Sequence, residues 1–330
     1  MKKLTGACLA AFILFGFACS GGGDSGKALM GVVTPAADHG FTGESIRHGE
    51  AQAKLLAEQN GWDYRYLTAN ESGEQNNAVD TLISLKPKVI ILWPVTGDEL
   101  RNAAQKIVDA KIPLIIYDRF IPGFTGASAE ISGDNVTIGE MMGKYFDKYF
   151  AGDDQINYLE FLGDSSTVPG ERSGGFASTS RGRFNKIQSF VTNWSQQTAM
   201  EQLESFLGSA SRAEIESLQA IYTDDDEEVM GIVGALKNYK GPAAINIKLI
   251  SGVGGRRENM DLFENSGLTG IDFVTYTFSP SMIRDAIDLG AKIMKGESVS
   301  KDVKIPSTEI DKTNYKDYMN SDAFKIRYSI

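Results

Sequence analysis

Charged side chains follow short apolar stretches of this chain at the points where those stretches end. The clearest pair is Asp118 and Arg119, directly after the apolar residues 114–117. A planar guanidinium can donate to two adjacent hydroxyl groups, while an aspartate accepts hydrogen bonds from neighbouring ones. The same residues exposed on a surface would form an ion pair worth little. The pair therefore matters only if the fold encloses it.

Catalytic chemistry has weaker support in the sequence. A hydrolase needs a nucleophile with a base, yet His39 and His48 are the only histidines and no Gly-x-Ser-x-Gly motif occurs. Neither histidine has a partner at a spacing suited to zinc. We expect His48 on an exposed helix face and His39 at the rim of a pocket. A glycosidase with paired carboxylates stays an alternative, because the chain contains 43 acidic residues.

Two other segments are unsuited to a cofactor or a metal. Residues 252–255 contain three glycines, but Arg257 stands where a dinucleotide fingerprint needs its third glycine. We expect these glycines to form a tight turn between a strand and a helix. The contiguous acids 224–228 lack the spacing of a calcium loop, and all except Asp225 are expected to be helix-start charges. We therefore predict neither a cofactor nor a metal.

The elements that would position these side chains alternate between apolar strands and helices. Short apolar strands separated by helices indicate parallel sheets covered on both faces. After residues 131–135, where Asp134 or Asn135 can cap a helix, the alternation begins again. The fold class is thus α/β, with two doubly wound parallel-sheet lobes and a ligand cleft at the strand ends. Strands are predicted at 29–33, 64–67, 89–92, 114–117, 156–161, 187–191, 218–222, 247–250 and 273–276, and first-lobe helices at about 42–59, 75–84 and 97–110.

The first residues have the pattern of a secretory signal peptide. A basic start precedes an apolar run that ends at Ala18, shorter than the roughly 20 residues that span a membrane. Cys19 and the Gly- and Ser-rich segment after it resemble a lipoprotein processing site, although Gly16 replaces the usual aliphatic residue. We predict a signal peptide at 1–18 and a lipidated Cys19 with a flexible linker at 19–27. Cleavage near Ala18 without lipidation is the alternative.

The net charge and the cysteine content limit the partners and the compartment that the protein can have. The net charge of −10 repels phosphate backbones, which argues against nucleic acid as a partner. Cys8 and Cys19 both fall in or at the end of the leader, so the folded part has no thiol for a disulfide. We expect export to the periplasm or cell envelope, with membrane attachment only through the lipid on Cys19.

Five segments carry a resemblance to a known family: residues 34–41, 117–119, 132–135, 170–176 and 224–227. Their order and spacing resemble the sugar-binding proteins of bacterial ABC importers, in the ribose, galactose and galactofuranose group. The resemblance implies the type I periplasmic binding protein fold, in which a three-segment hinge joins the lobes. It places the N-terminal lobe at 28–131 and 280–304, the C-terminal lobe at 132–279 and 305–330, and the crossings near 132–134, 277–279 and 304–306.

The resemblance also implies which residues contact the ligand. Hydroxyls and carboxylates would accept hydrogen bonds from a sugar, and aromatic faces would cover its C–H side. The implied positions are Thr34, Asp38, Phe41, Asp118, Arg119, Arg172, Trp194, Asp225 and Thr277, to which we add Trp93 because relatives often have asparagine there. Core packing is the alternative for the aromatic residues, and helix capping for Asp38. Relatives have a carboxylate that anchors the sugar near the position of Gly254, and this chain lacks it. The identity of the sugar therefore cannot be inferred from those relatives.

The resemblance implies a solute-binding lipoprotein without enzymatic activity. It would capture a monosaccharide in the cleft and deliver it to the membrane permease of an ABC transporter. The alternative within binding proteins is a sensor that presents a sugar or a sugar-like signal to a chemoreceptor or histidine kinase. The same fold serves bacterial transcription repressors, but the leader, the acidic charge and the lack of a DNA-binding headpiece argue against that use.

Overall fold

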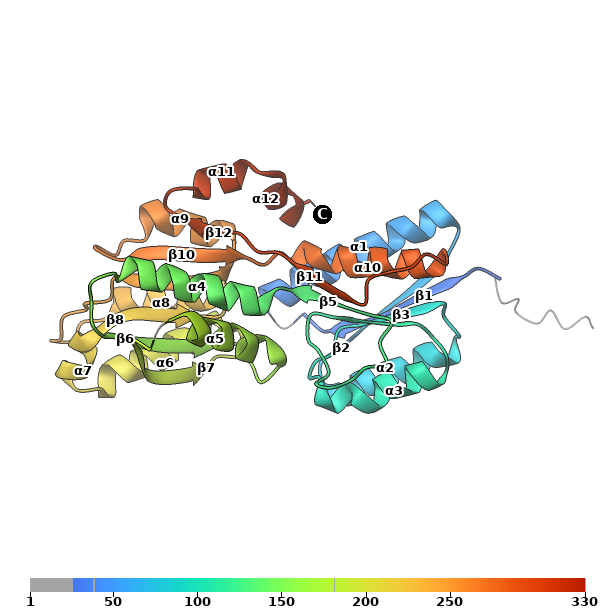
Figure 1. Cartoon of the computed structure of the whole chain (residues 1–330), viewed down its shortest axis with the longest axis horizontal. Coiled ribbons are helices and arrows are strands. Elements are labelled where there is room, and N and C mark those ends of the chain that lie inside the picture. The colour runs from blue at the N-terminus through green and yellow to red at the C-terminus, as the bar shows by residue number, and fades with distance from the viewer. Residues whose placement is uncertain (1–25, 38, 181, 330) are drawn as a thin grey trace, which may run out of the picture.

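The computed structural model describes residues 26–37, 39–180 and 182–329. The predicted signal peptide, Cys19 with its lipidation, and Asp38 lie outside the described residues. Within them the chain forms two β-sheets with helices on both faces of each, side by side along the long axis of the molecule (Figure 1). This is the α/β architecture of two doubly wound lobes that the sequence predicts.

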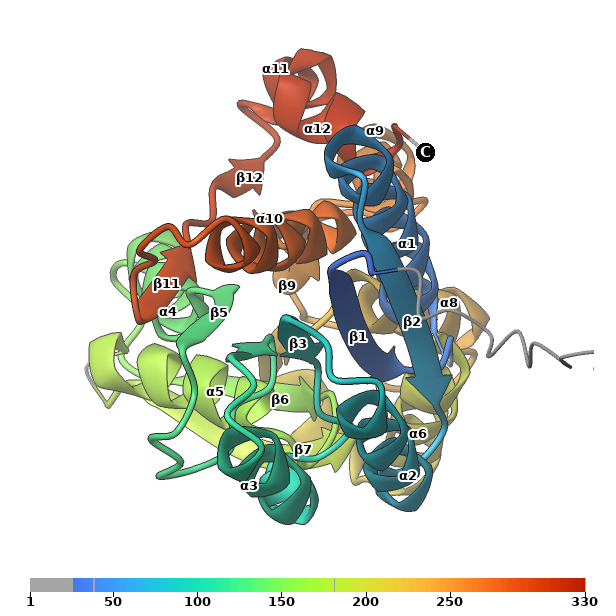
Figure 2. The same cartoon turned by 90° about the vertical axis from the view of Figure 1, so that its right-hand side faces the viewer.

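The N-terminal lobe is built on a wholly parallel six-stranded sheet. Helices α1 and α10 cover one face and α2 and α3 the other (Figure 2). In sheet order the strands are β11 (Asp302–Ile305), β5 (Ala129–Gly133), β4 (Leu114–Tyr117), β3 (Val89–Leu92), β1 (Leu29–Pro35) and β2 (Asp63–Ala69). The helices are α1 (Gly40–Asn60), α2 (Ser72–Ser84), α3 (Arg101–Asp109), α10 (Ile283–Met294) and the short 3₁₀ turns η1 (Asp98–Leu100) and η2 (Pro280–Met282).

The C-terminal lobe repeats this plan with one antiparallel edge strand, β12 (Glu309–Asp311). Its other strands, in sheet order, are β10 (Asp272–Thr277), β9 (Leu249–Gly254), β8 (Leu218–Thr223), β6 (Ile156–Leu162) and β7 (Phe184–Val191). Its helices are α4 (Asn135–Tyr149), α5 (Thr167–Thr179), α6 (Gln196–Ser209), α7 (Arg212–Ser217), α8 (Asp226–Asn238), α9 (Arg257–Asn265), α11 (Tyr315–Asn320) and α12 (Asp322–Arg327).

Alternating side chains on the central strands supply the cores on both sides of each sheet. On β3, Val89 and Ile91 pack with α1 and α10, whereas Ile90 and Leu92 pack with α2 and α3. All four are fully buried. Because both faces of a central parallel strand are covered, its sequence is a continuous apolar run, and such runs predicted β3 and β4 to the residue.

The chain passes between the two sheets three times: from β5 to α4, from β10 to η2 and from β11 to β12. The first passage is fixed by Asp134, whose side chain caps α4 by accepting a hydrogen bond from the Thr137 backbone N–H at 3.2 Å. The first two passages touch, because a Cβ at Gly133 would collide with the ring of Phe278. The segments that join the lobes are thus packed together.

Three expectations need correction. His48, expected on an exposed helix face, is fully buried, and its Nε2 lies 2.8 Å from the carbonyl oxygen of Arg327. Burial lowers the pKa of its imidazole to about 4. The strand expected at 247–250 begins at Leu249 and continues through Gly254, so Gly252 and Gly254 belong to the strand rather than to a turn. The helix expected at 97–110 consists of η1 and α3. Among the described residues no helix is long and apolar enough to span a membrane.

Candidate functional site

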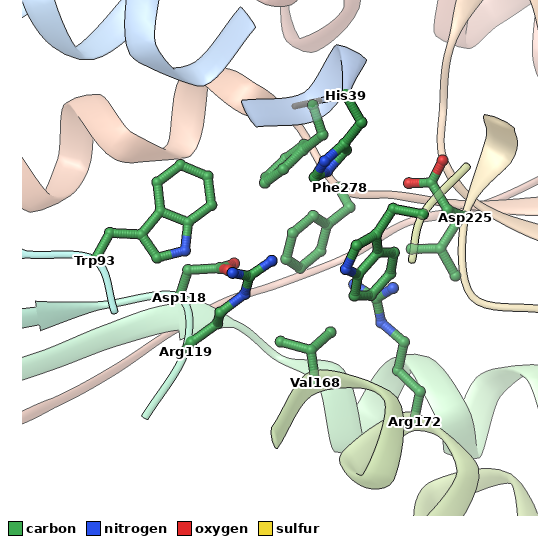
Figure 3. Close-up of a pocket in the computed structure, with 11 residues that line it drawn as sticks. His39, Trp93, Asp118, Arg119, Val168, Arg172, Asp225 and Phe278 are labelled. Atoms are coloured by element: carbon green, nitrogen blue, oxygen red, sulfur yellow. The ribbon is translucent and has the colours of Figure 1, made fainter. Parts of the chain in front are cut away.

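A cavity lies between the two lobes, at the carboxyl ends of strands from both sheets (Figure 3). It encloses about 350 Å³ of empty space, part of it open to solvent. Its walls combine six apolar side chains with charged ones. The lining residues are His39, Phe41, Trp93, Asp118, Arg119, Val168, Arg172, Trp194, Asp225, Val253 and Phe278.

Asp118 occupies a strained backbone position directly after β4. Its φ of 63° lies in the left-handed region, which non-glycine residues adopt uncommonly, although aspartate does so more often than most. The side chain is 4% exposed, and its Oδ1 has no hydrogen-bond partner among the described residues. Burial raises the pKa of this carboxyl, while Arg119, Arg172 and the side chain of Trp93 oppose that rise. The site therefore holds a buried acceptor that a ligand could satisfy.

Arg119 is anchored so that little of its guanidinium remains for a ligand. Its Nη1 donates to the carbonyl oxygen of Val95 at 2.8 Å, and its Nη2 lies 3.0 Å from Oδ2 of Asp164. The sequence suggested a fork that donates to two ligand hydroxyls. In the structure Nε is the buried nitrogen without a partner, so this arginine presents one donor beside the free oxygen of Asp118.

Arg172, on α5, enters the cavity from the other lobe and is also held by protein groups. Its Nε donates to Oδ1 of Asn135 at 3.0 Å, and its Nη1 donates to the carbonyl oxygen of Asp224 at 2.5 Å. The guanidinium lies 4.6 Å from the centre of the Phe278 ring and is 2% exposed. A buried cation over an aromatic face is stabilised by the ring quadrupole. Arg172 is thus a fixed wall of the site.

Aromatic rings from both lobes surround these charged groups. Trp194 has a left-handed φ of 61°, directly after the left-handed Asn193 at the end of β7. Its ring stacks on His39 at 6.2 Å between centroids. Across the cavity Phe41 packs edge-on against Trp93 at 5.8 Å. Flat apolar faces and hydrogen-bonding groups therefore line the cavity together, and two residues with left-handed backbone, Asp118 and Trp194, help to form it.

Asp225 faces the cavity from the start of α8. Its side chain caps the helix by accepting a hydrogen bond from the Glu227 N–H at 2.7 Å. Burial and the neighbouring Glu227 and Asp226 raise the pKa of the Asp225 carboxyl to about 7. Of the adjacent acids, Asp226, Glu227 and Glu228 form the first turn of α8, as expected of helix-start charges. Asp224 precedes the helix, and Asp224, Asp226 and Glu228 are fully buried and bonded within the protein. In the described part of the chain no group of three or more His, Cys, Asp or Glu residues is arranged to hold a metal ion.

The structure brings together seven of the ten residues that the sequence singled out: Phe41, Trp93, Asp118, Arg119, Arg172, Trp194 and Asp225. Thr34 and Thr277 do not line this cavity. The Thr34 hydroxyl is buried and donates to the carbonyl oxygen of Pro35, and the Thr277 hydroxyl accepts a hydrogen bond from the Thr308 N–H at 2.9 Å. Asp38 lies outside the described residues, and His39 lines the cavity as expected.

Sequence reasoning missed Val168, Phe278 and the ion-pair partner Asp164 as parts of the site, and treated Val253 only as a departure from relatives. Phe278 follows Thr277 by one residue. Because successive side chains of extended backbone point in opposite directions, a shift of one residue there would have identified it. Val168 and Asp164 offered no such signal, since their roles depend on how the second lobe meets the first.

Two curated import binding proteins are similar to this chain. A D-apiose import binding protein of Actinobacillus succinogenes is 25% identical over 217 residues, which cover 64% of this chain and 66% of that relative, just under two thirds of its length. A ribose import binding protein of Salmonella typhimurium is 24% identical over 233 residues, covering 68% of this chain and 74% of the relative.

Solved structures share the fold. A galactofuranose binding protein has a TM-score of 0.77 at 19% identity and covers 91% of this chain and 100% of its own. A Caulobacter myo-inositol binding protein has a TM-score of 0.74 at 21% identity, covering 88% and 95%. A family model described as the periplasmic binding protein domain matches residues 30–298. Two doubly wound lobes, a cavity between them and a match over most of the sequence together show that the chain belongs to the periplasmic binding protein family.

Proposed function

We propose that this protein is the solute-binding component of an ABC importer and that it captures a monosaccharide in the cavity between its lobes. One observation carries the proposal: Asp118 Oδ1 and Arg119 Nε are buried beside the cavity without partners. Buried polar atoms in native proteins are almost always hydrogen-bonded, so an unpaired acceptor and an unpaired donor on residues that line the same cavity favour a ligand that supplies both. A sugar hydroxyl both donates and accepts.

The aromatic walls agree with the same ligand class. A monosaccharide presents hydroxyls at its edge and C–H groups on its faces, and Trp194, Phe41 and Phe278 offer apolar faces next to the charged groups. The relatives named above are described as binding apiose, ribose, galactofuranose or myo-inositol. These compact polyhydroxylated molecules suit a small cavity.

The two-lobed arrangement supports a clamp mechanism. A sugar held by Asp118 and Arg119 of the first lobe also meets Arg172, Trp194 and Asp225 of the second, so it stabilises the closed arrangement by its contacts to both lobes. The closed protein would then dock on a membrane permease. Export by the signal peptide and tethering through a lipid on Cys19 would keep it near that permease.

A thermal-shift screen tests the ligand class directly. The panel contains D-ribose, D-apiose, L-arabinose, D-galactose, L-fucose and myo-inositol, with sodium citrate and L-leucine as an anion and an amino acid. A sugar at 100 times its Kd adds about 2.7 kcal/mol to stability, or roughly 5–10 °C in Tm for lobes of this size. Calorimetry then gives the stoichiometry, expected to be one. A shift with leucine or citrate and none with any sugar or polyol would overturn the proposal.

A further inference from the structure

The C-terminal segment, α12 with residues 328–329, contacts both lobes at their junction, where Figure 1 shows α12 between α9 and α1. On the side of the C-terminal lobe, the hydroxyl of Tyr328 accepts a hydrogen bond from the Arg257 N–H at 3.0 Å. On the side of the N-terminal lobe, Nη2 of Arg284 donates to the Ser329 hydroxyl at 3.3 Å. The segment is therefore attached to elements that must separate when the lobes open.

Arg327 is the most enclosed residue of this segment, at 3% exposure. Its Nη1 donates to the carbonyl oxygens of Gly254 at 2.7 Å and Phe278 at 3.2 Å. Its Nη2 lies 3.4 Å from the Glu44 carboxylate on α1, and its own carbonyl oxygen meets His48 of the same helix. One guanidinium thus joins β9, the second passage between the lobes and α1.

Two of the backbone groups that Arg327 contacts lie at the wall of the cavity or next to it. Gly254 directly follows Val253, and Val253 and Phe278 both line the cavity. Gly254 itself has a φ of 150°, a conformation that side chains disfavour. Its carbonyl oxygen also accepts a hydrogen bond from the Phe278 N–H at 3.2 Å, so Arg327 binds the point where these two wall segments are joined. Arg327 is not among the lining residues. It can influence a ligand only by fixing the backbone at these two wall positions.

We propose that α12 is a strap that favours the closed arrangement of the lobes and that Arg327 is a positioning residue for the Val253 and Phe278 walls. Its part in ligand binding rests on the proposed function of the cavity; its part in lobe closure does not. The strap lies beyond residues 30–298, which the family model matches.

Glu44 is the group that makes the strap sensitive to opening. A buried guanidinium bound to two neutral carbonyls still needs a counter-charge, and losing the partner of a buried charge is costly. Glu44 belongs to the N-terminal lobe, whereas Gly254 belongs to the other. Opening would therefore separate Arg327 from either its carboxylate or its carbonyl partners, and the closed arrangement keeps both.

Three variants separate the two roles. Glu44→Gln removes the charged tie to the first lobe but leaves Arg327 on its carbonyl partners. Arg327→Met removes both. Lys325→Met is the matched control, because it removes one positive charge from the same helix at a side chain that is 66% exposed. The radius of gyration of the unliganded full chain is measured by X-ray scattering, and amide hydrogen exchange is followed at residues 253–255 and 277–279.

We expect a larger radius of gyration for Glu44→Gln and Arg327→Met than for the wild type and Lys325→Met. Faster exchange at the two cavity segments is expected in Arg327→Met alone. Affinity for D-ribose, L-arabinose or myo-inositol, whichever the wild type binds, should fall by about tenfold in Arg327→Met.

If Arg327→Met does not fold, the scattering of Glu44→Gln alone tests whether the strap favours the closed arrangement. A radius of gyration of Glu44→Gln equal to that of the wild type would overturn the strap. Unchanged hydrogen exchange at the two cavity segments in Arg327→Met would overturn the positioning role. If no probe binds the wild type, the proposed function fails while the scattering result still stands.

Discussion

Arg119 of the N-terminal lobe lies 3.0 Å from Asp164 of the C-terminal lobe, in an ion pair whose side chains are 7% and 21% exposed. Burial would raise the pKa of the Asp164 carboxyl, but Arg119 and the Ser166 groups hold it below its usual value. Removing one partner of an ion pair this enclosed leaves the other charge buried and unpaired, which costs more than the same change on the surface. The cavity is therefore bordered by a bond that exists only while the lobes are together.

Asp164→Asn should weaken sugar binding by about tenfold, because it removes the charge that holds Arg119 in place and one tie between the closed lobes. Calorimetry with whichever sugar gives the largest thermal shift measures the change. Asp98→Asn is the matched control, since Asp98 pairs with Arg101 at 3.1 Å on an exposed surface with a side chain that is 77% exposed. Equal affinities in the two variants would show that the interlobe pair has no part in binding.

Asp118→Asn should separate binding from stability. Asparagine tolerates the left-handed backbone and removes a buried carboxylate, so the free energy of unfolding should stay the same or rise. Affinity for the sugar should fall by more than tenfold, because an amide is a weaker acceptor than a carboxylate and leaves a buried hydroxyl poorly paired. Urea unfolding and calorimetry give the two quantities. Unchanged affinity would mean that the ligand does not use Asp118.

The sequence predicts the central strands of the fold well, because the residues of each strand carry the signal by themselves. Strands β3 and β4 are continuous apolar runs, and their covered faces need nothing else to identify them. Strand β12 and helix α12 went unpredicted, because they have three and six residues and are stabilised by contacts with distant parts of the chain. His48 shows the same limit: its burial depends on Arg327, 279 residues away along the chain.

In the candidate site, the positions of the side chains were predictable from the sequence, but their hydrogen-bond partners were not. Asp118 and Arg119 follow a strand, and the edge of a parallel sheet collects such residues, so their position was predictable. What each group offers was not. The two terminal nitrogens of Arg119 are bonded to Val95 and Asp164 rather than left for a ligand. These partners could not be predicted, because Val95 lies on another loop and Asp164 on the other lobe. Sequence thus identified the side chains, and tertiary contacts decided which of their atoms remain available.

Arg172→Lys should weaken sugar binding by more than tenfold although it keeps the positive charge. Lysine cannot bond Asn135 and the Asp224 carbonyl together while lying flat against Phe278, so the wall that Arg172 forms would loosen. Arg183→Lys is a closely matched control. Arg183 also belongs to the C-terminal lobe, donates to backbone carbonyls and contacts a phenylalanine ring. Arg183→Lys should lower Tm without changing affinity; a loss of affinity in it would point to general loosening of the lobe.

Asp225 gives the protein a measurable pH dependence. Its pKa of about 7 in the folded protein exceeds the usual value near 4 expected after unfolding. The folded state therefore binds the extra proton between about pH 4 and 7, and the contribution of Asp225 to stability falls as the pH rises through that window. Asparagine caps a helix as well as aspartate does and carries no such proton.

The unfolding free energy of Asp225→Asn minus that of the wild type should therefore grow by about 2–3 kcal/mol from pH 4 to 7 and stay level above pH 8. Urea unfolding at each pH measures it. Glu214→Gln provides a control of opposite sign: hydrogen bonds from Ser211 lower the pKa of Glu214, so this glutamate stabilises the folded state above its unfolded pKa and the corresponding difference should fall as the pH rises. A flat profile for Asp225→Asn would mean that Asp225 is ionised throughout, and that the cavity presents a carboxylate rather than a carboxylic acid to its ligand below neutral pH.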